Sequence, residues 1–145
     1  MKIEIKNFKD LTTHELYEIL RLRSEIFVVE QNCVYQDIDN NDFDAIHFLL
    51  KEGSDIVAYL RVLRLTEHNN EISFGRVIVN NKNRGKGYAR ILVNDVMEFI
   101  SKEYKDEAIL IEAQSYLKKF YGSFGFSCTS EEFLEDGIPH YWMKK

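Results

Sequence analysis

Polar and apolar residues follow one another along the chain with the spacings of short strands and helices. Residues 2–8 alternate charged and apolar side chains, which predicts a half-buried strand. Thr12 and Glu15 have the spacing of a helix capping box, and apolar residues from Leu16 to Phe27 recur at helical intervals. A helix is therefore expected to about residue 29, followed by an ordered polar loop over 31–44.

The remainder of the chain alternates between strand and helix patterns. Apolar runs bounded by turn residues predict strands at 45–51, 56–65 and 71–79, and a long amphipathic helix from Tyr88 to Ile100. A buried strand at 108–113, a short helix at 117–124 and a strand pair at 126–133 and 138–143 complete the pattern. The order β-α-β-β-β-α-β-α-β-β predicts an α/β (α+β) fold, a mixed and mostly antiparallel sheet of about seven strands flanked by helices.

The junction between the strand 71–79 and the following helix is the most informative segment. It reads Arg84-Gly85-Lys86-Gly87-Tyr88-Ala89 and continues with Arg90. Glycines at such a turn let the backbone approach a bulky anion, and the N–H groups of the first helical turn then point at that anion. Cations at a helix N-terminus oppose the helix dipole, so three of them there favour a bound anion. We therefore interpret the segment as a pyrophosphate cradle.

Composition restricts the kinds of protein that fit this pattern. A chain of 145 residues with 45% hydrophobic and 30% charged residues is expected to form a single folded domain, residues 1–145. Its net charge of −5 argues against a general nucleic-acid binder, whereas a small basic cluster on an acidic protein suits a small polyanion.

Location and redox state are also predicted from composition. No apolar run is long enough to span a bilayer, and the N-terminus lacks a signal-peptide core, so we expect a cytoplasmic protein without a membrane partner. Cys33 and Cys128 are then expected to be free thiols. The four His and two Cys residues lack ligand spacing, so no metal site is expected.

Three nucleotide-binding patterns compete for the cradle. A Walker loop needs more widely spaced glycines followed by Lys-Ser/Thr, and a Rossmann fingerprint needs a third glycine where Arg90 stands. The pattern Q/R-x-x-G-x-G/A is met at every specified position. On this segment the chain resembles the GCN5-related N-acetyltransferases (GNAT superfamily).

Other segments strengthen this resemblance. Residues 120–126, Phe-Tyr-Gly-Ser-Phe-Gly-Phe, are similar to the family's F-Y-x-x-x-G-F segment, and the order of predicted elements matches the family fold. Within the family, residues 23–31, 35–39, 75–79 and 136–140 resemble the ElaA-like subgroup.

The resemblance implies acetyl-coenzyme A (acetyl-CoA) as acyl donor, no metal, and a role for each cradle residue. Arg84, Gly85, Lys86, Gly87, Tyr88, Ala89 and Arg90 would hold the pyrophosphate of coenzyme A. The backbone of Val77, Ile78 and Val79 would pair with the pantetheine arm, and an N–H near Ile78 or Val79 would hold the thioester oxygen. Gln114 would bond a pantetheine amide. Tyr121 would bind beside the thioester and protonate the departing thiolate.

The general base is the residue that the resemblance leaves open. The family's usual glutamate aligns with Ser73 in this chain. Glu71 lies two residues earlier on the same strand face, Glu112 interrupts an apolar strand, and His47 and His140 have suitable ordinary pKa values. Glu71, Glu112 and His140 are retained as catalytic candidates, each with a purely structural alternative.

The acceptor is expected to be a small-molecule or peptide amine, and no nucleic acid is expected. Acidic residues in the loops that flank the acceptor side of this family suit a cationic amine, although a solvated loop face explains them equally well: Glu30, Asp37, Asp39, Asp42, Glu131, Glu132, Glu135 and Asp136. Phe133, Tyr141 and Trp142 can form either core or a dimer surface, so a monomer and a homodimer are both open.

Two other functions compete with an N-acetyltransferase. Acyl-homoserine-lactone synthases share the fold and a related N-terminal region, but this chain is short for them and has an intact cradle. A non-catalytic coenzyme A-binding module is the second alternative, because no general base is assigned.

Overall fold

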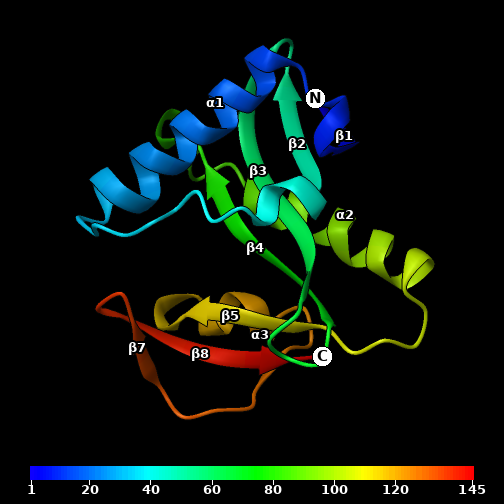
Figure 1. The fold of residues 1–145 in the computed structure, drawn as a ribbon, viewed down its shortest axis with the longest axis vertical. Helices are drawn as coiled ribbons and strands as arrows, with labels where there is room; N and C mark the ends of the chain where they lie inside the picture. The colour runs from blue at the N-terminus through cyan, green and yellow to red at the C-terminus, as the bar shows by residue number, and fades with distance from the viewer.

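The computed structural model describes residues 1–145 as two antiparallel sheets with helices packed on them (Figure 1). The first sheet has the order β1-β2-β3-β4, formed by Lys2–Asn7, Ile46–Glu52, Asp55–Leu65 and Glu71–Val79. In the second, β8 (Ile138–Lys144) pairs with β5 (Leu110–Gln114), β6 (Ser127–Cys128) and β7 (Phe133–Glu135). An isolated parallel bridge between Ile72 and Ile109 joins β4 to the chain just before β5.

Helices α1 (Thr13–Arg23) and α2 (Tyr88–Glu103) cover opposite faces of the first sheet. Ile19 and Leu22 of α1 pack on Leu49 of β2, whereas Leu92 of α2 packs with Phe48 on the other face. Because successive side chains of β2 point to opposite faces of the sheet, β2 packs against α1 on one face and against α2 on the other. The short helix α3 (Lys118–Gly122) follows β5 and packs against it. None of the helices combines the length and the apolar character needed to cross a membrane.

The predicted start of α1 is confirmed, but its end differs from the prediction. Thr12 accepts the Glu15 N–H at 3.0 Å and the Glu15 carboxylate accepts the Thr12 N–H at 2.9 Å, which completes the capping box. Beyond Arg23 the chain continues in π-helical geometry as η2 (Ser24–Glu30), where the α-helix was expected to run on. Shorter 3-10 turns are η1 (Phe8–Asp10), η3 (Asn41–Asp44), η4 (Asn81–Asn83) and η5 (Ser115–Leu117).

The C-terminal strands also differ from the prediction. The expected strand over 126–133 is two short strands, β6 and β7, so the fold has eight strands rather than about seven. Between them the Ser130 hydroxyl accepts the Trp142 backbone N–H at 3.0 Å. A side-chain acceptor thus replaces the strand ladder at this point, and the chain leaves the sheet.

A bulge in β4 gives the first sheet its local irregularity. Tyr59 pairs with Ile78 and Arg61 with Gly75, so β4 carries one extra residue opposite Leu60. Arg76 within the bulge has a φ of +53°, a backbone conformation that non-glycine residues seldom adopt. Beyond the Ile72–Ile109 bridge, β4 and β5 form no further pairs, and the two sheets separate (Figure 1).

Candidate active site

The glycine turn of the predicted cradle lies at the start of α2. Gly85 and Gly87 both have a φ of +78°, and no atom lies within 4 Å of where a Cβ would stand on either residue. Gly87 is the N-cap, and no side chain caps the helix. The first N–H groups of α2 therefore have no intrahelical partner and face a cavity of about 390 Å³, which we call the cradle cavity.

The side chains of the cradle residues do not all line the cradle cavity. Arg84 lines the cradle cavity but forms a two-pronged ion pair with Glu30 of η2, at 2.8 and 3.0 Å. Lys86 lies over the Tyr88 ring, and Arg90 packs on the rings of Phe120 and Phe124, so neither lines the cavity. The Tyr88 hydroxyl donates to Glu52 of β2.

The end of β4 borders this cavity. Val79 lines the cradle cavity, and Val77 lines a second and larger cavity, whereas the Ile78 side chain is buried against α1. Because β5 does not pair with this part of β4, the strand presents an open backbone edge.

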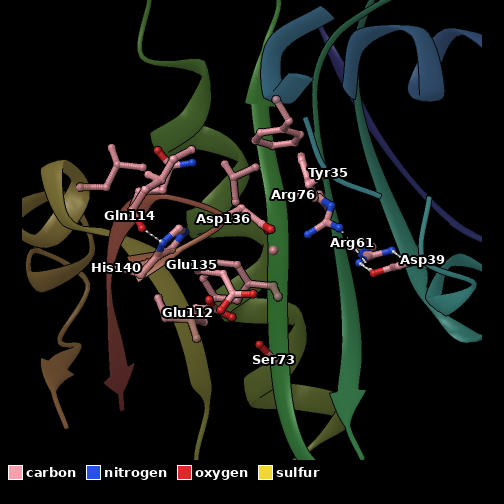
Figure 2. Close-up of a pocket in the computed structure, with 18 of the residues that line it drawn as sticks. Tyr35, Asp39, Arg61, Ser73, Arg76, Glu112, Gln114, Glu135, Asp136 and His140 are labelled. Carbon is pink, nitrogen blue, oxygen red and sulfur yellow. Dashed lines mark hydrogen bonds and ion pairs between the residues drawn. The ribbon is translucent and has the colours of Figure 1, made fainter. Parts of the chain in front are cut away.

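The second cavity, which we call the cleft, has a volume of about 420 Å³ and lies between the two sheets (Figure 2). One wall is formed by alternate residues of β3, among them Arg61, and by the consecutive β4 residues 73–77. The other wall is the facing side of the second sheet, with Glu112 and Gln114 of β5, Glu135 of β7, and Ile138, His140 and Trp142 of β8.

Two glutamine side chains lie where the cleft meets the cradle cavity. The amides of Gln31 and Gln114 donate to each other at 3.2 Å, and both residues line both cavities. Gln114 therefore lies at the junction of the two cavities with its amide already paired, and its contact with a donor arm stays a prediction. Gln31 was not predicted as a site residue, although it ends the segment 23–31 that carries the subgroup resemblance.

Tyr121 of α3 also lines the cleft. It is 5% exposed and sits among aromatic rings, with centroids 6.1 Å from Phe74 and 5.1 Å from Phe120. Burial raises the pKa of the Tyr121 hydroxyl well above its ordinary value. The side chain therefore keeps its proton at neutral pH, as a proton donor must.

The candidate general bases differ in their position relative to the cleft and in their polar partners. His140 lines the cleft, and its Nδ1 donates to the Ile138 carbonyl at 2.7 Å, which leaves Nε2 as the basic nitrogen. Glu112 lies in the open cleft, where partial desolvation and then the charge of Glu135 raise its pKa. Glu71 lies outside the cleft lining and pairs with Lys144 at 3.1 Å. His47 is buried with both ring nitrogens bonded, to the Tyr59 hydroxyl and the Asp42 carbonyl.

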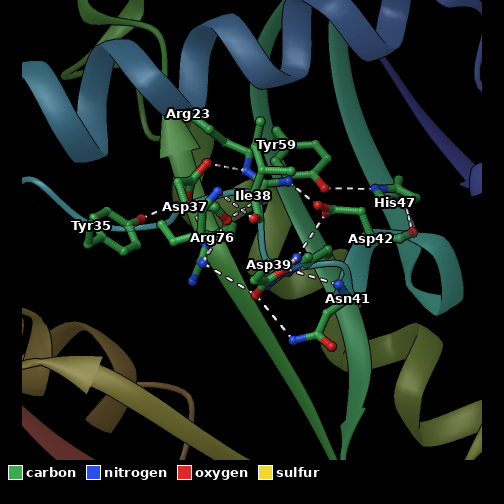
Figure 3. A network of polar contacts seen from close by, with 12 residues as sticks. Arg23, Tyr35, Asp37, Ile38, Asp39, Asn41, Asp42, His47, Tyr59 and Arg76 are labelled. Atoms are coloured by element: carbon green, nitrogen blue, oxygen red, sulfur yellow. Dashed lines mark hydrogen bonds and ion pairs between the residues drawn. The ribbon is translucent and has the colours of Figure 1, made fainter.

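A buried ionic network, which the sequence did not predict, supports the first wall of the cleft (Figure 3). Arg23 of α1 is fully buried and binds Asp37 at 3.0 Å and Asp42 at 2.6 Å. Arg61 and Arg76 bind Asp39, at 2.6 and 3.5 Å, and Arg76 also binds Asp37 at 2.8 Å. Three loop carboxylates expected to face an acceptor are therefore neutralised by arginines.

Two further expectations concern aromatic residues and thiols. Phe133 and Trp142 stack on each other near the cleft and Tyr141 packs on the main core, so the three do not form one exposed dimer surface. Cys33 and Cys128 are both free. No group of three or more His, Cys, Asp or Glu side chains is arranged to hold a metal ion.

Comparison with known proteins identifies the family. A model of the acetyltransferase (GNAT) domain matches residues 12–145. The chain belongs to the GNAT acetyltransferase family. Among curated relatives of this GNAT protein, Protein ElaA of Escherichia coli K12 is 39% identical over 138 residues, covering 94% of this chain and 90% of ElaA. The ElaA-like assignment is thus confirmed.

Solved structures agree with this assignment. An acyl-CoA N-acyltransferase from Pseudomonas aeruginosa has a TM-score of 0.92 at 35% identity, covering 100% of this chain and 99% of that one. The crystal structure of E. coli ElaA also has a TM-score of 0.92, at 36% identity, covering 99% and 98%. A CoA-dependent acyl-homoserine lactone synthase shares the fold alone, with a TM-score of 0.79 at 18% identity, covering 98% of this chain and 81% of the synthase.

Proposed function

We propose that this GNAT protein is a single-domain, cytoplasmic N-acetyltransferase that moves the acetyl group of acetyl-CoA to a primary amine by direct attack. The proposal rests on three structural features that lie next to one another. Unpaired helix N–H groups at Gly87 face one cavity, the open edge of β4 follows, and a cleft with proton-transfer groups adjoins it.

The cradle residues suit the donor's pyrophosphate. Two glycines with positive φ keep side chains out of the space before α2, and the helix N-terminus supplies N–H donors and a favourable dipole. Arg84 adds a guanidinium once it releases Glu30. The open edge of Val77–Val79 offers backbone groups to an extended arm, and Gln114 offers an amide at the entrance to the cleft.

When bound, acetyl-CoA supplies a thioester carbonyl that an amine can attack. His140 Nε2 takes a proton from the attacking nitrogen as the C–N bond forms. A backbone N–H of β4 beyond the bulge stabilises the oxygen as it gains charge. Tyr121 gives its proton to the sulfur as the C–S bond breaks, so the amide and the free thiol are the products.

His140 is the base that this arrangement favours. It lies directly opposite Gln114 in the β5–β8 register, at the boundary between the two cavities. The Ile138 carbonyl fixes its tautomer, and Phe133 stacks on its ring with centroids 6.0 Å apart. Glu112 lies two pairs farther from the boundary, opposite Trp142, and Glu71 lies outside the cleft lining.

The proposal is tested by titrating the protein with acetyl-CoA and then measuring thiol release with a panel of primary amines. We expect saturable binding and amine-dependent thiol release that His140→Ala reduces by about 100-fold. Binding without release on any amine would instead favour a coenzyme A-binding module. Release only with S-adenosylmethionine as acceptor would favour a homoserine-lactone-synthase-like enzyme.

A further inference from the structure

The two walls of the cleft differ in net charge. In the network that supports the first wall, Asp37, Asp39 and Asp42 are matched by Arg23, Arg61 and Arg76, so the network is neutral as a whole. On the second wall Glu112, Glu135 and Asp136 form no ion pair with any residue of the chain. The uncompensated charge of the cleft is therefore negative and lies on the second sheet.

Glu112 lies toward the end of the cleft at which the two sheets are joined, and it is exposed there. The bridge Ile72–Ile109 joins the two sheets there, and Glu112 follows it by three residues on β5. Trp142 is its partner across the β5–β8 register. Figure 2 shows the Glu112 and Glu135 side chains on the same side of the cleft, and the charge of Glu135 acts on Glu112.

An independent observation also indicates a ligand at this end. Ser73 immediately follows the bridge on β4, is 4% exposed, and lines the cleft without a hydrogen bond to any protein group. Its hydroxyl is directed toward the side that carries Glu112 (Figure 2). The hydroxyl is not fully enclosed, so it can bond a polar group that binds in the cleft.

We infer that this end of the cleft, formed by Glu112, Ser73 and Trp142 with added charge from Glu135, binds a second ammonium group of the acceptor. The inference rests on the proposed function and names its substrate class: linear alkyl diamines and polyamines. An alkylammonium has three N–H donors, which the two carboxylates and the hydroxyl can accept.

The register also sets the length of the acceptor. The reacting amine lies beside His140 and Gln114, and Glu112 is the next residue on the same face of β5. Successive residues on one face of a strand are about 7 Å apart. An extended alkyl chain advances by about 1.2 Å per bond, so the nitrogens of a four- or five-carbon diamine are about 6–7 Å apart.

The opposite wall offers the competing possibility. Arg76 uses Nε and Nη2 to bind Asp37 and Asp39, which leaves Nη1 at the cleft without a partner. An acceptor with a carboxylate at its far end would use that nitrogen. The neutral balance of the first wall and the unpaired carboxylates of the second favour the diamine.

The test compares kcat/KM for diamines of two to six carbons with alkylamines and ω-amino acids of equal chain length. We expect the four- or five-carbon diamine to exceed the matched alkylamine by at least about tenfold. Glu112→Gln and Glu135→Gln should each reduce that ratio, with Glu112→Gln reducing it about tenfold. The matched controls Glu131→Gln and Glu132→Gln alter exposed carboxylates outside the cleft lining, so the ratio should stay as in the wild type.

Equal kcat/KM values for the diamine and the matched alkylamine, or a higher kcat/KM for the ω-amino acid, would overturn the inference. So would a ratio that both cleft variants leave unchanged. Calorimetric binding of the four-carbon diamine separates this inference from the proposed function. Binding that Glu112→Gln weakens and Glu131→Gln does not would support the subsite even without acetyl transfer, whereas no binding and no kinetic preference would exclude it.

Discussion

The hydroxyl of Tyr121 is a polar group within a cluster that is otherwise aromatic. The ring packs among Phe74, Phe120 and Phe126 and accounts for the burial of the residue. Packing does not require the hydroxyl, but chemistry at the cleft does. A tyrosine in an i, i+3, i+4 apolar stripe is ordinarily core, and only its position on the cleft lining distinguishes it.

Tyr121→Phe separates these two roles. It removes the hydroxyl and keeps the ring, so we expect kcat to fall about 100-fold with little change in acetyl-CoA affinity. Because burial raises the pKa of Tyr121, the loss should be uniform from pH 6 to about pH 9. Steady-state kinetics over that range and calorimetry of donor binding measure both effects. An unchanged kcat would remove Tyr121 from the mechanism.

Sequence patterns predicted individual elements well, and contacts between distant elements poorly. The capping box at Thr12, the glycines of the cradle and the strand leading into it depend on neighbouring residues, so local spacing identified them. Arg23 and Asp37 lie fourteen positions apart and meet only because α1 and the following loop fold over β3 and β4. No short-range pattern distinguishes such a buried pair from solvated charges.

The contact between η2 and the start of α2 predicts a competition within the cradle. Glu30 holds Arg84 by two charge-assisted hydrogen bonds, so a pyrophosphate must displace it. Glu30→Gln should free the guanidinium and tighten coenzyme A binding about threefold, because exposed ion pairs contribute little. Calorimetry measures the affinity, with Glu25→Gln as a control on the same element. Weaker binding in Glu30→Gln would show that Glu30 orients Arg84 for the ligand.

The start of α1 predicts a pH-dependent contribution to stability. Burial alone would raise the pKa of Glu15, but hydrogen bonds from Lys51, Thr12 and Lys6 outweigh it and lower the pKa from 4.5 to about 2. A carboxylate whose pKa is lower in the folded than in the unfolded protein stabilises the fold at pH values above its unfolded-state pKa. That contribution is lost as the pH falls through the folded-state pKa. The depression corresponds to roughly 3 kcal/mol.

Glu15→Gln should therefore lower the free energy of unfolding by about 2–3 kcal/mol at pH 7. The difference from wild type should shrink between pH 4.5 and about 2, where Glu15 itself takes up a proton in the folded protein. Urea denaturation at several pH values measures it. Glu18→Gln, on the exposed side of the same helix, provides the control. A deficit that persists unchanged at pH 2 would contradict the electrostatic explanation.

At the scale of the whole molecule, the two sheets form one site because few contacts cross the space between them. The Ile72–Ile109 bridge joins them at one end, and at the other the reciprocal amide bonds of Gln31 and Gln114 connect the residue after η2 to β5. An extended donor arm that runs along β4 and enters the cleft must pass this amide pair. Donor binding is therefore expected to exchange the bonds between the glutamines for bonds to the donor.

This exchange predicts unequal effects of the two glutamines on donor affinity. Gln114→Ala removes the amide that remains beside the donor, so acetyl-CoA binding should weaken about tenfold. Gln31→Ala removes the bonds to Gln114 that donor binding would otherwise have to break, but it also removes the bond that Gln31 would form to the donor. These two effects oppose each other, so the affinity should change less than about threefold. Gln36→Ala is the control, since that side chain bonds the Ile38 carbonyl within its own loop. Equal losses for Gln31→Ala and Gln114→Ala in calorimetric titrations would mean that the pair must stay closed to hold the two sheets in place, and that the donor arm follows another path into the cleft.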